Sequence, residues 1–283
     1  MGELRTRMDN DMIVRGRADR TRASYLAAVA RLARFYRRSP DQLSHGEVQA
    51  YLLYLIKERK ASHSTCNIAV CAFRFLYLTT LGRDRAQFDI PYGKRPQRLP
   101  EIFSREEIAR LLEAAKNPRH HAVLATTYAA GLRVGEVVKL KPADIDATRM
   151  TIRVEQAKGA KDRYSLLSPL LLEELRGYWK QFRPKVWLFE TRSGKHLDVS
   201  GAQKFYMTAK LKARITKRGG IHALRHAFAT HLLEAGEDLH TIQRLLGHGD
   251  LSTTSRYLHL TQAGLKSKAV SRDLLKLPEP GLR

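Results

Sequence analysis

A stretch with three prolines, residues 86–103, is the feature that most limits how this chain can fold. It reads AQFDIPYGKRPQRLPEIF and also holds a glycine and three basic side chains. Proline interrupts both helices and sheets, so the stretch predicts an extended, fairly stiff linker. At 283 residues the chain is long enough for two domains with separate cores. We therefore expect a domain of residues 1–85, the linker 86–103 and a second domain of residues 104–283.

Helical periodicity dominates the first of these domains. From Thr21 onward, apolar residues recur at helical spacing, which predicts a helix to about Tyr36. Ser44 followed by Glu47 is a capping-box pattern and predicts the start of a second helix. A third helix is expected from residues 62–64 to Gly82. Residues 1 to about 18 show no clear periodicity, and we expect them to form a mobile lead-in.

The sequence after the linker is mostly helical, with one change of period. Between residues 150 and 155 apolar and polar side chains alternate, which predicts a half-buried strand. Residues 157–162 are expected to form a tight turn, and residues 163–167 a returning strand. These patterns predict a mainly α second domain with one small antiparallel sheet. Helices are expected from Ser104, where Glu107 completes a second capping box, over 119–130, from Arg133, over 168–182 and around 198–213.

The charge of the chain points to a polyanionic partner. It carries 51 Lys and Arg against 28 Asp and Glu, a formal net charge of +23. An excess of this size favours nucleic acid as the first candidate. A soluble basic protein without such a partner, or one that meets anionic lipid, is the alternative.

Nothing in the sequence predicts a membrane protein or a secreted one. No run approaches the eighteen or so apolar residues that a membrane-spanning helix needs. The N-terminal residues lack the apolar core of a signal peptide. Cys66 and Cys71 lie five apart in a helical pattern, which suits free thiols in a reducing compartment. We expect a cytoplasmic protein associated with the nucleoid.

The stretch from His222 to Tyr257 holds an unusual density of His, Arg and Tyr side chains. His222 and Arg225 lie three apart in a helical pattern, so both can project from one helix face. Gly236 and Gly247 stand where glycines commonly end helices. Imidazoles, a guanidinium and a phenol within one short stretch indicate phosphate chemistry.

Transesterification of a DNA phosphodiester needs side chains of these types. A phenol can attack phosphorus once it loses its proton, and forked guanidiniums suit the charge that grows on the non-bridging oxygens. A lysine on a hairpin turn can protonate the leaving 5′ oxygen, and imidazoles can take the phenolic proton or donate to the phosphate. This scheme requires no metal and no cofactor. The candidate catalytic residues are Arg133, Lys158, His222, Arg225, His248 and Tyr257.

Each candidate also has a simpler interpretation when it is considered alone. Arg133 could form a surface ion pair, Lys158 could be a solvated turn cation, and Tyr257 could be an ordinary core or surface tyrosine. His222 and His226 have the spacing that zinc-binding helices use. However, the HExxH pattern is absent and no cluster of carboxylates accompanies them, which argues against zinc.

The candidates lie in motifs whose order and spacing are more specific than any single residue. The motifs are GLRVGE at 131–136, KGAKDR at 158–163, HALRHAFATH at 222–231, LLGH at 245–248, STT at 252–254 before Tyr257, and PQRLP at 96–100 in the linker. Together these motifs resemble those of the tyrosine recombinases, also called the phage integrase family, and within it the Xer-like branch. The resemblance covers roughly residues 20–265.

The resemblance implies a role for each candidate. Tyr257 would be the nucleophile, forming a 3′-phosphotyrosyl bond and freeing a 5′ hydroxyl, so that rejoining needs no ATP. Arg133 and Arg225 would hold the scissile phosphate. The remaining roles would be general acid for Lys158, base or phosphate contact for His222, phosphate donor for His248 and orientation of the site for Glu136.

The resemblance also implies a fold and an assembly. A helical, SAM-like core-binding domain and a catalytic domain would close around double-stranded DNA, and four protomers would assemble on two sites. The segment after Tyr257 would pack on its own domain or be exchanged with the next protomer. A catalytically silent DNA-binding or architectural protein of the same fold, and a type IB topoisomerase-like enzyme, are the alternatives. The loosely Xer-like N-terminal region favours a mobile genetic element as the source of the enzyme.

Overall fold

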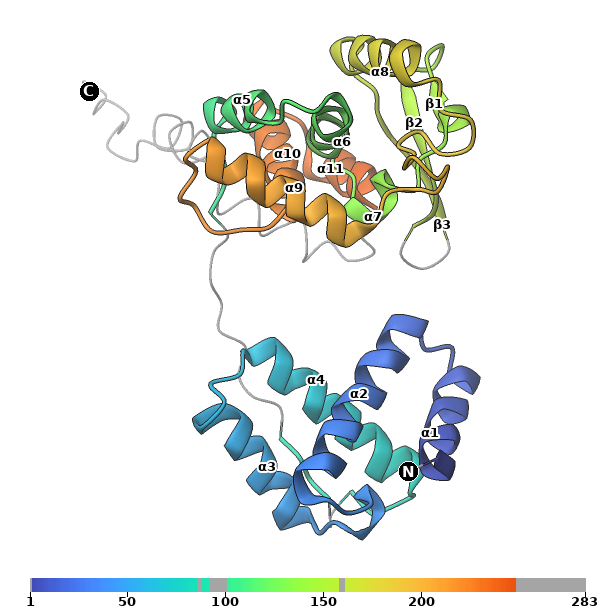
Figure 1. Cartoon of the computed structure of the whole chain (residues 1–283), viewed down its shortest axis with the longest axis vertical. Helices are drawn as coiled ribbons and strands as arrows, with labels where there is room; N and C mark the ends of the chain where they lie inside the picture. The colour runs from blue at the N-terminus through green and yellow to red at the C-terminus, as the bar shows by residue number, and fades with distance from the viewer. Residues whose placement is uncertain (1, 86–87, 92–100, 158–160, 248–283) are drawn as a thin grey trace, which may run out of the picture. The chain divides into compact units, whose positions relative to one another are not determined.

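The computed structural model describes residues 2–85, 88–91, 101–157 and 161–247 (Figure 1). The chain divides into two compact units, Met1–Arg98 and Leu99–Arg283. Among the described helices, none is both long and apolar enough to cross a membrane. Phe88 and Ile90, within the expected linker, are buried in the core of the first unit, because their side chains pack with its helices.

The first unit is all helical. Its core is built by the apolar faces of the helices, with Leu32, Val48, Phe73 and Tyr77 among its buried residues. Ser44 and Glu47 form the predicted capping box at the start of the helix His45–Lys57, each bonding the backbone amide of the other. The elements are α1 (Gly2–Val14), α2 (Asp19–Tyr36), the 3₁₀ turn η1 (Pro40–Gln42), α3 (His45–Lys57), α4 (His63–Arg74) and the π-helical η2 (Phe75–Thr80).

The first residues of the chain are helical, so the expectation of a mobile lead-in was wrong. Residues Gly2–Val14 form α1, and Met8 and Met12 are almost completely buried in the core of the first unit. Leu4, Met8 and Met12 repeat every four residues and make a stripe only one residue wide, with polar residues on both sides. So narrow a stripe gives little periodic signal, yet it buries two large side chains against α2 and η2.

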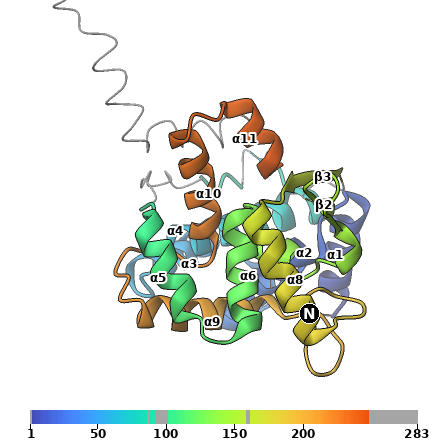
Figure 2. The same ribbon diagram turned by 90° about the horizontal axis from the view of Figure 1, so that it is seen from above.

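The second unit is mainly helical and centres on α6 (Pro118–Ala129). This helix packs against α5, α8, α9 and α10, and Figure 2 shows it between α5 and α8. Ser104 and Glu107 form the second predicted capping box at the start of α5. The other helices are α5 (Arg105–Ala114), α7 (Val134–Val137), η3 (Pro142–Asp144), α8 (Pro169–Phe182), α9 (Val199–Lys212), α10 (His222–Glu234) and α11 (Leu239–Leu246).

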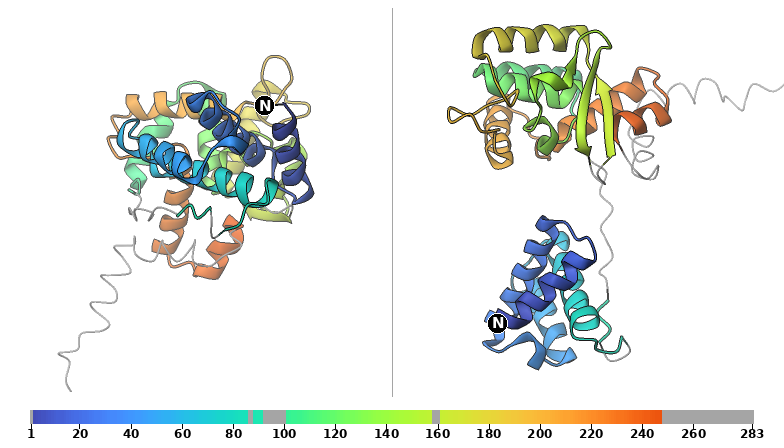
Figure 3. Two further views of the ribbon diagram at one scale, coloured as in Figure 1. Left: turned by 90° about the horizontal axis from the view of Figure 1, so that it is seen from below. Right: turned by 90° about the vertical axis from the view of Figure 1, so that its right-hand side faces the viewer.

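A small antiparallel sheet covers one side of the second unit. Its strands β1 (Ile145–Asp146), β2 (Thr151–Ala157) and β3 (Lys161–Leu166) follow the order β1-β2-β3. Figure 3 shows β2 and β3 as a long hairpin beside the helices. Val154 pairs with Arg163, so the returning strand carries an arginine opposite an apolar residue. The predicted fold class, mainly α with one small antiparallel sheet, is confirmed.

Candidate anion-binding site

The loop between α6 and α7 brings the GLRVGE motif against α10. Gly131 ends α6 with a φ of +60°, a conformation that side chains with a Cβ rarely adopt. A Cβ at this position would lie 2.3 Å from the Cδ1 atom of Phe228 on α10. Glycine is therefore needed at position 131 for two reasons: the positive φ, and the close approach of this loop to α10.

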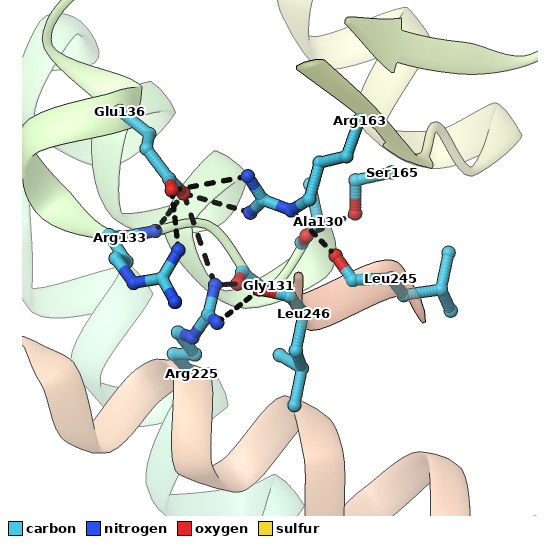
Figure 4. Close-up of polar contacts among 9 residues, drawn as sticks. All are labelled: Ala130, Gly131, Arg133, Glu136, Arg163, Ser165, Arg225, Leu245 and Leu246. Atoms are coloured by element: carbon cyan, nitrogen blue, oxygen red, sulfur yellow. Dashed lines mark hydrogen bonds and ion pairs between the residues drawn. The ribbon is translucent and has the colours of Figure 1, made fainter. Parts of the chain in front are cut away.

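Arg133 and Glu136 are locked together at the start of α7. Arg133 is the N-cap residue, and its backbone N–H donates to Oε2 of Glu136 at 2.8 Å. Its guanidinium Nη1 donates to Oε1 of the same carboxylate at 2.7 Å. The Glu136 carboxylate therefore fixes both the main chain and the side chain of Arg133, which remains partly open to solvent (Figure 4).

Arg163, a residue to which the sequence analysis gave no role, binds the same carboxylate. Its Nη1 and Nη2 donate to Oε1 and Oε2 of Glu136 at 3.1 and 2.8 Å, as a forked pair. Its Nε donates to the carbonyl oxygen of Leu245 on α11 at 3.1 Å. The alternation of β3 gives no signal for this residue, because the apolar Tyr164 and Leu166 are exposed while Arg163 lies on the same strand face as the buried Ser165. An arginine on a buried strand face needs an acidic partner.

Arg225 lies beneath the same cluster and is almost completely buried, with 1% of its side chain exposed. Its Nη1 donates to the carbonyl oxygen of Gly131 at 2.7 Å, and its Nη2 donates to that of Leu246. Its Nη1 also lies 3.9 Å from Oε2 of Glu136. Arg225 on α10 thus joins the α6–α7 loop to the end of α11, and Figure 4 shows the three arginines converging on one carboxylate.

The electrostatics of this cluster favour a further anion. Burial alone would raise the pKa of Glu136, but hydrogen bonds and charge from Arg163, followed by those from Arg133, hold that pKa below its ordinary value. Glu136 is therefore ionised at neutral pH. Three guanidiniums surround this single carboxylate, so positive charge is in excess among the described residues of the cluster. Such an excess in a partly desolvated place attracts an anion.

His222 begins α10 next to this positive charge. Partial desolvation by the surrounding protein, and then the charges of Arg225 and Arg133, lower the pKa of the His222 imidazole, although the residue is exposed. The ring is therefore neutral at pH 7 and able to accept a proton. Its edge-to-face neighbour is His226, with ring centroids 4.7 Å apart. In the part of the chain that the structure describes, no group of three or more His, Cys, Asp or Glu is arranged to hold a metal.

A groove leads away from Arg133 along the sheet. It is lined by Lys139, Lys141, Arg153 and Trp187, together with acidic side chains. Lys141 donates to Oε2 of Glu155 at 2.9 Å, and Arg153 donates to Asp144 and Glu155. The charges in this groove are therefore organised by ion pairs on β2 and its neighbouring turn.

The structure thus brings four of the predicted site residues to one place: Arg133, Glu136, His222 and Arg225. Lys158, His248 and Tyr257 lie outside the described residues. Helix α11 ends at Leu246, and Gly247 follows with a φ of +61°, as the position of this glycine predicted.

Comparison with known proteins bears on both units. Residues 101–263 match the phage integrase family, and residues 4–87 match the family described as "Phage integrase, N-terminal SAM-like domain". A Sinorhizobium fredii protein, y4qK, which carries the provisional name integrase/recombinase, is 44% identical over 99% of this chain and 92% of its own length. The tyrosine recombinase XerD of Oceanobacillus iheyensis is 32% identical over 90% of this chain and 92% of its own length.

Solved structures show the same relationship. The crystal structure of XerA recombinase aligns with a TM-score of 0.57 and 28% identity, covering 96% of this chain and 98% of that one. A lambda integrase tetramer bound to a Holliday junction aligns with a TM-score of 0.75, covering 90% of this chain and 76% of that one. At 17% identity, the second likeness shows a common fold.

The fold and the sequence together define a DNA recombinase. The chain belongs to the phage integrase family and is a site-specific tyrosine recombinase of the Xer-like type. A catalytically silent protein of this fold, or a topoisomerase-like enzyme, is not favoured by these relatives.

Proposed function

We propose that this recombinase cuts and rejoins double-stranded DNA through Tyr257. The phenolic oxygen attacks the scissile phosphorus, a 3′-phosphotyrosyl bond forms, and the 5′ oxygen leaves as a hydroxyl. The reverse attack by a 5′ hydroxyl of another strand restores the phosphodiester and frees Tyr257. The energy of the bond is kept in the phosphotyrosine, so no ATP is needed. Guanidiniums stabilise the charge and side-chain acids and bases transfer the protons, so the scheme needs no metal.

One observation carries this proposal: the arginine cluster on Glu136 holds more positive charge than its carboxylate neutralises. A phosphodiester in the transition state gains negative charge on its non-bridging oxygens, and preorganised guanidiniums stabilise such charge. Arg133 is the partly exposed member of the cluster and is therefore the direct phosphate donor. Arg225 supplies buried positive charge from below.

The remaining roles concern protons. His222 has a lowered pKa and a neutral ring at pH 7, which suits a base that takes the phenolic proton of Tyr257. We assign the protonation of the leaving 5′ oxygen to Lys158, five residues before Arg163 in the β2–β3 hairpin sequence. His248 follows directly after Gly247 and is assigned as a phosphate hydrogen-bond donor. Glu136 orients the arginines and takes no part in proton transfer.

The partner is double-stranded DNA carrying the recombination sites. The net charge of +23 supports this partner, and the lambda integrase of matching fold is a tetramer bound to a Holliday junction. By analogy, four protomers of this chain act on two sites, with residues 1–85 as a core-binding domain and residues 104–283 as the catalytic domain. The enzyme acts in the cytoplasm at the nucleoid and serves a mobile genetic element.

The test is covalent trapping on a nicked duplex. The recognition site is first obtained by selecting bound duplexes from a random-sequence pool, and a nick beside the scissile phosphate then lets the cleaved fragment diffuse away. With EDTA present, the wild-type protein should form a covalent protein–DNA band. Tyr257→Phe should form none while still binding the duplex.

A matched control separates the nucleophile from a general loss of tyrosine. Tyr164 lies on β3 with 56% of its surface exposed, so Tyr164→Phe should cleave like the wild type. A covalent band that persists in Tyr257→Phe, or one that requires added divalent metal, would contradict the proposal.

A further inference from the structure

We propose that Arg163 is a positioning residue of the strand-transfer reaction, which fixes the Glu136 carboxylate relative to the end of α11. The proposal rests on the proposed function, in which Arg133 and His248 contact the scissile phosphate. Arg163 acts on Arg133 through the shared carboxylate, and it acts on the end of α11 through the carbonyl oxygen of Leu245.

The contacts of Arg163 join three segments that are distant in the sequence. Its forked pair of N–H groups holds Glu136 at the start of α7, and its Nε holds the carbonyl oxygen of Leu245 near the end of α11. The side chain itself extends from β3 and is 8% exposed. Because three donors in one plane are used in two directions, a lysine cannot reproduce this arrangement.

Gly247 lies against Arg163 and leaves no room for a side chain of its own. A Cβ at Gly247 would lie 2.5 Å from Cδ and 2.9 Å from Nε of Arg163. The main chain that leaves α11 therefore passes directly over the stem of Arg163. A shift of the Arg163 side chain would therefore move Gly247, the residue that precedes the catalytic candidate His248 in the sequence.

The cluster also explains why the loss of Arg163 would misplace Arg133. Glu136 is 10% exposed; its Oε1 accepts from the Arg133 guanidinium and its Oε2 from the Arg133 backbone N–H, whereas Arg163 donates to both oxygens. Without Arg163 the carboxylate has room to turn, and it takes the bound guanidinium of Arg133 with it. A displacement of about 1 Å from the productive geometry lowers a rate by about 10²-fold.

The first experiment measures cleavage and binding separately on the selected nicked duplex. Arg163→Lys and Arg163→Met should lower the single-turnover rate of covalent-complex formation by about 10²-fold, with the Kd for the duplex changed by no more than about threefold. Arg149→Met is the control, since Arg149 lies in the same unit, is 79% exposed and carries the same charge. This control should cleave like the wild type.

A second substrate distinguishes positioning from a general loss of folding. A methylphosphonate at the scissile position lacks the negative charge that Arg133 meets, so the placement of Arg133 matters less. The defect of Arg163→Met should therefore shrink from about 10²-fold to a few-fold on this substrate. An equal defect on both substrates would mean that Arg163 acts on overall structure alone, and it would overturn the proposal.

Hydrogen exchange tests the structural half of the proposal without DNA. In Arg163→Met, amide exchange should accelerate in residues 133–138 and 239–247, whereas Arg149→Met should show no such change. Unchanged exchange in both segments would refute the positioning role whatever the cleavage rates are. If the wild type forms no covalent complex at all, the proposed function fails, and the exchange data still decide whether Arg163 positions these segments.

Discussion

Replacing Glu136 by glutamine removes the carboxylate that Arg133, Arg163 and Arg225 share while keeping the shape of the side chain. The amide keeps one oxygen, but its NH₂ group would face the guanidinium of Arg163 as a second donor. The forked pair at 3.1 and 2.8 Å is then lost. Arg163 and Arg225, which are 8% and 1% exposed, would be left with uncompensated charge.

The size of the effect follows from this burial. Removing one partner of a buried ion pair costs about 3–5 kcal/mol. Arg133 can turn toward water, so we expect the lower end, about 3 kcal/mol of unfolding free energy at pH 7. For a domain of this size the melting temperature should fall by about 6–12 °C. Cleavage should slow by about 10²-fold because Arg133 loses its orientation.

The pH dependence of stability tests whether the destabilisation comes from the lost ion pairs of Glu136. In the folded protein the pKa of Glu136 is below its ordinary value of 4.5, so its ion pairs contribute stability that is complete above pH 4.5. This contribution is lost as the pH falls through the folded-state pKa. The difference in unfolding free energy between the wild type and Glu136→Gln should therefore be full at pH 7 and shrink below pH 4.5.

The assay is urea unfolding of both proteins from pH 7 to pH 3, followed by circular dichroism, with single-turnover cleavage at pH 7. The control is Glu113→Gln, which removes a charge from α5 in the same unit and lies outside the arginine cluster. A constant difference across this pH range, or wild-type cleavage by Glu136→Gln, would refute the claim that this carboxylate organises the site.

Three further predictions concern single residues. Gly131→Ala should destabilise the protein by about 2–5 kcal/mol in urea unfolding, because alanine disfavours the positive φ and its Cβ would overlap Phe228. The control Gly177→Ala, where a Cβ meets no other atom, should be neutral or stabilising, and an equal effect of both substitutions would contradict the prediction. Covalent-complex formation should rise with pH and level off below the ordinary His pKa of 6.5, because the pKa of His222 is lowered; His222→Gln should flatten the acid limb, and an unchanged profile would exclude His222 as the base. Lys158→Ala should slow cleavage by about 10²–10⁴-fold and be restored by a 5′-thiolate leaving group, which needs no proton; absence of rescue would remove its role as the acid.

The sequence predicted the parts of the fold that depend on local signals. Ser44 with Glu47, and Ser104 with Glu107, each mark a helix start because both capping partners lie within one turn. The alternation from Met150 to Glu155 predicted β2, since strand faces differ in burial along neighbouring residues. The candidate residues Arg133, Glu136, His222 and Arg225 were named from residue type and from the order and spacing of their motifs, and they lie together in the structure.

Features that depend on contacts between distant segments were not predicted. Helix α1 was missed because its buried stripe is one residue wide, and only packing on α2 and η2 gives it a partner. The contacts of Arg163 are with Glu136, 27 residues away, and with Leu245, 82 residues away. Similarly, the need for glycine at position 131 comes from Phe228 on another helix. No local sequence pattern reports contacts between residues that are so far apart in the chain.

The identity of the covalently bound residue tests the central claim most directly. The trapped protein–DNA complex is digested with trypsin and nuclease, and the cross-linked peptide is sequenced by mass spectrometry. The account predicts the peptide of residues 257–266, YLHLTQAGLK, with a nucleotide 3′-phosphate on Tyr257 and a free 5′ hydroxyl on the released strand. A nucleotide on any other residue, or a link through a 5′-phosphate, would contradict it.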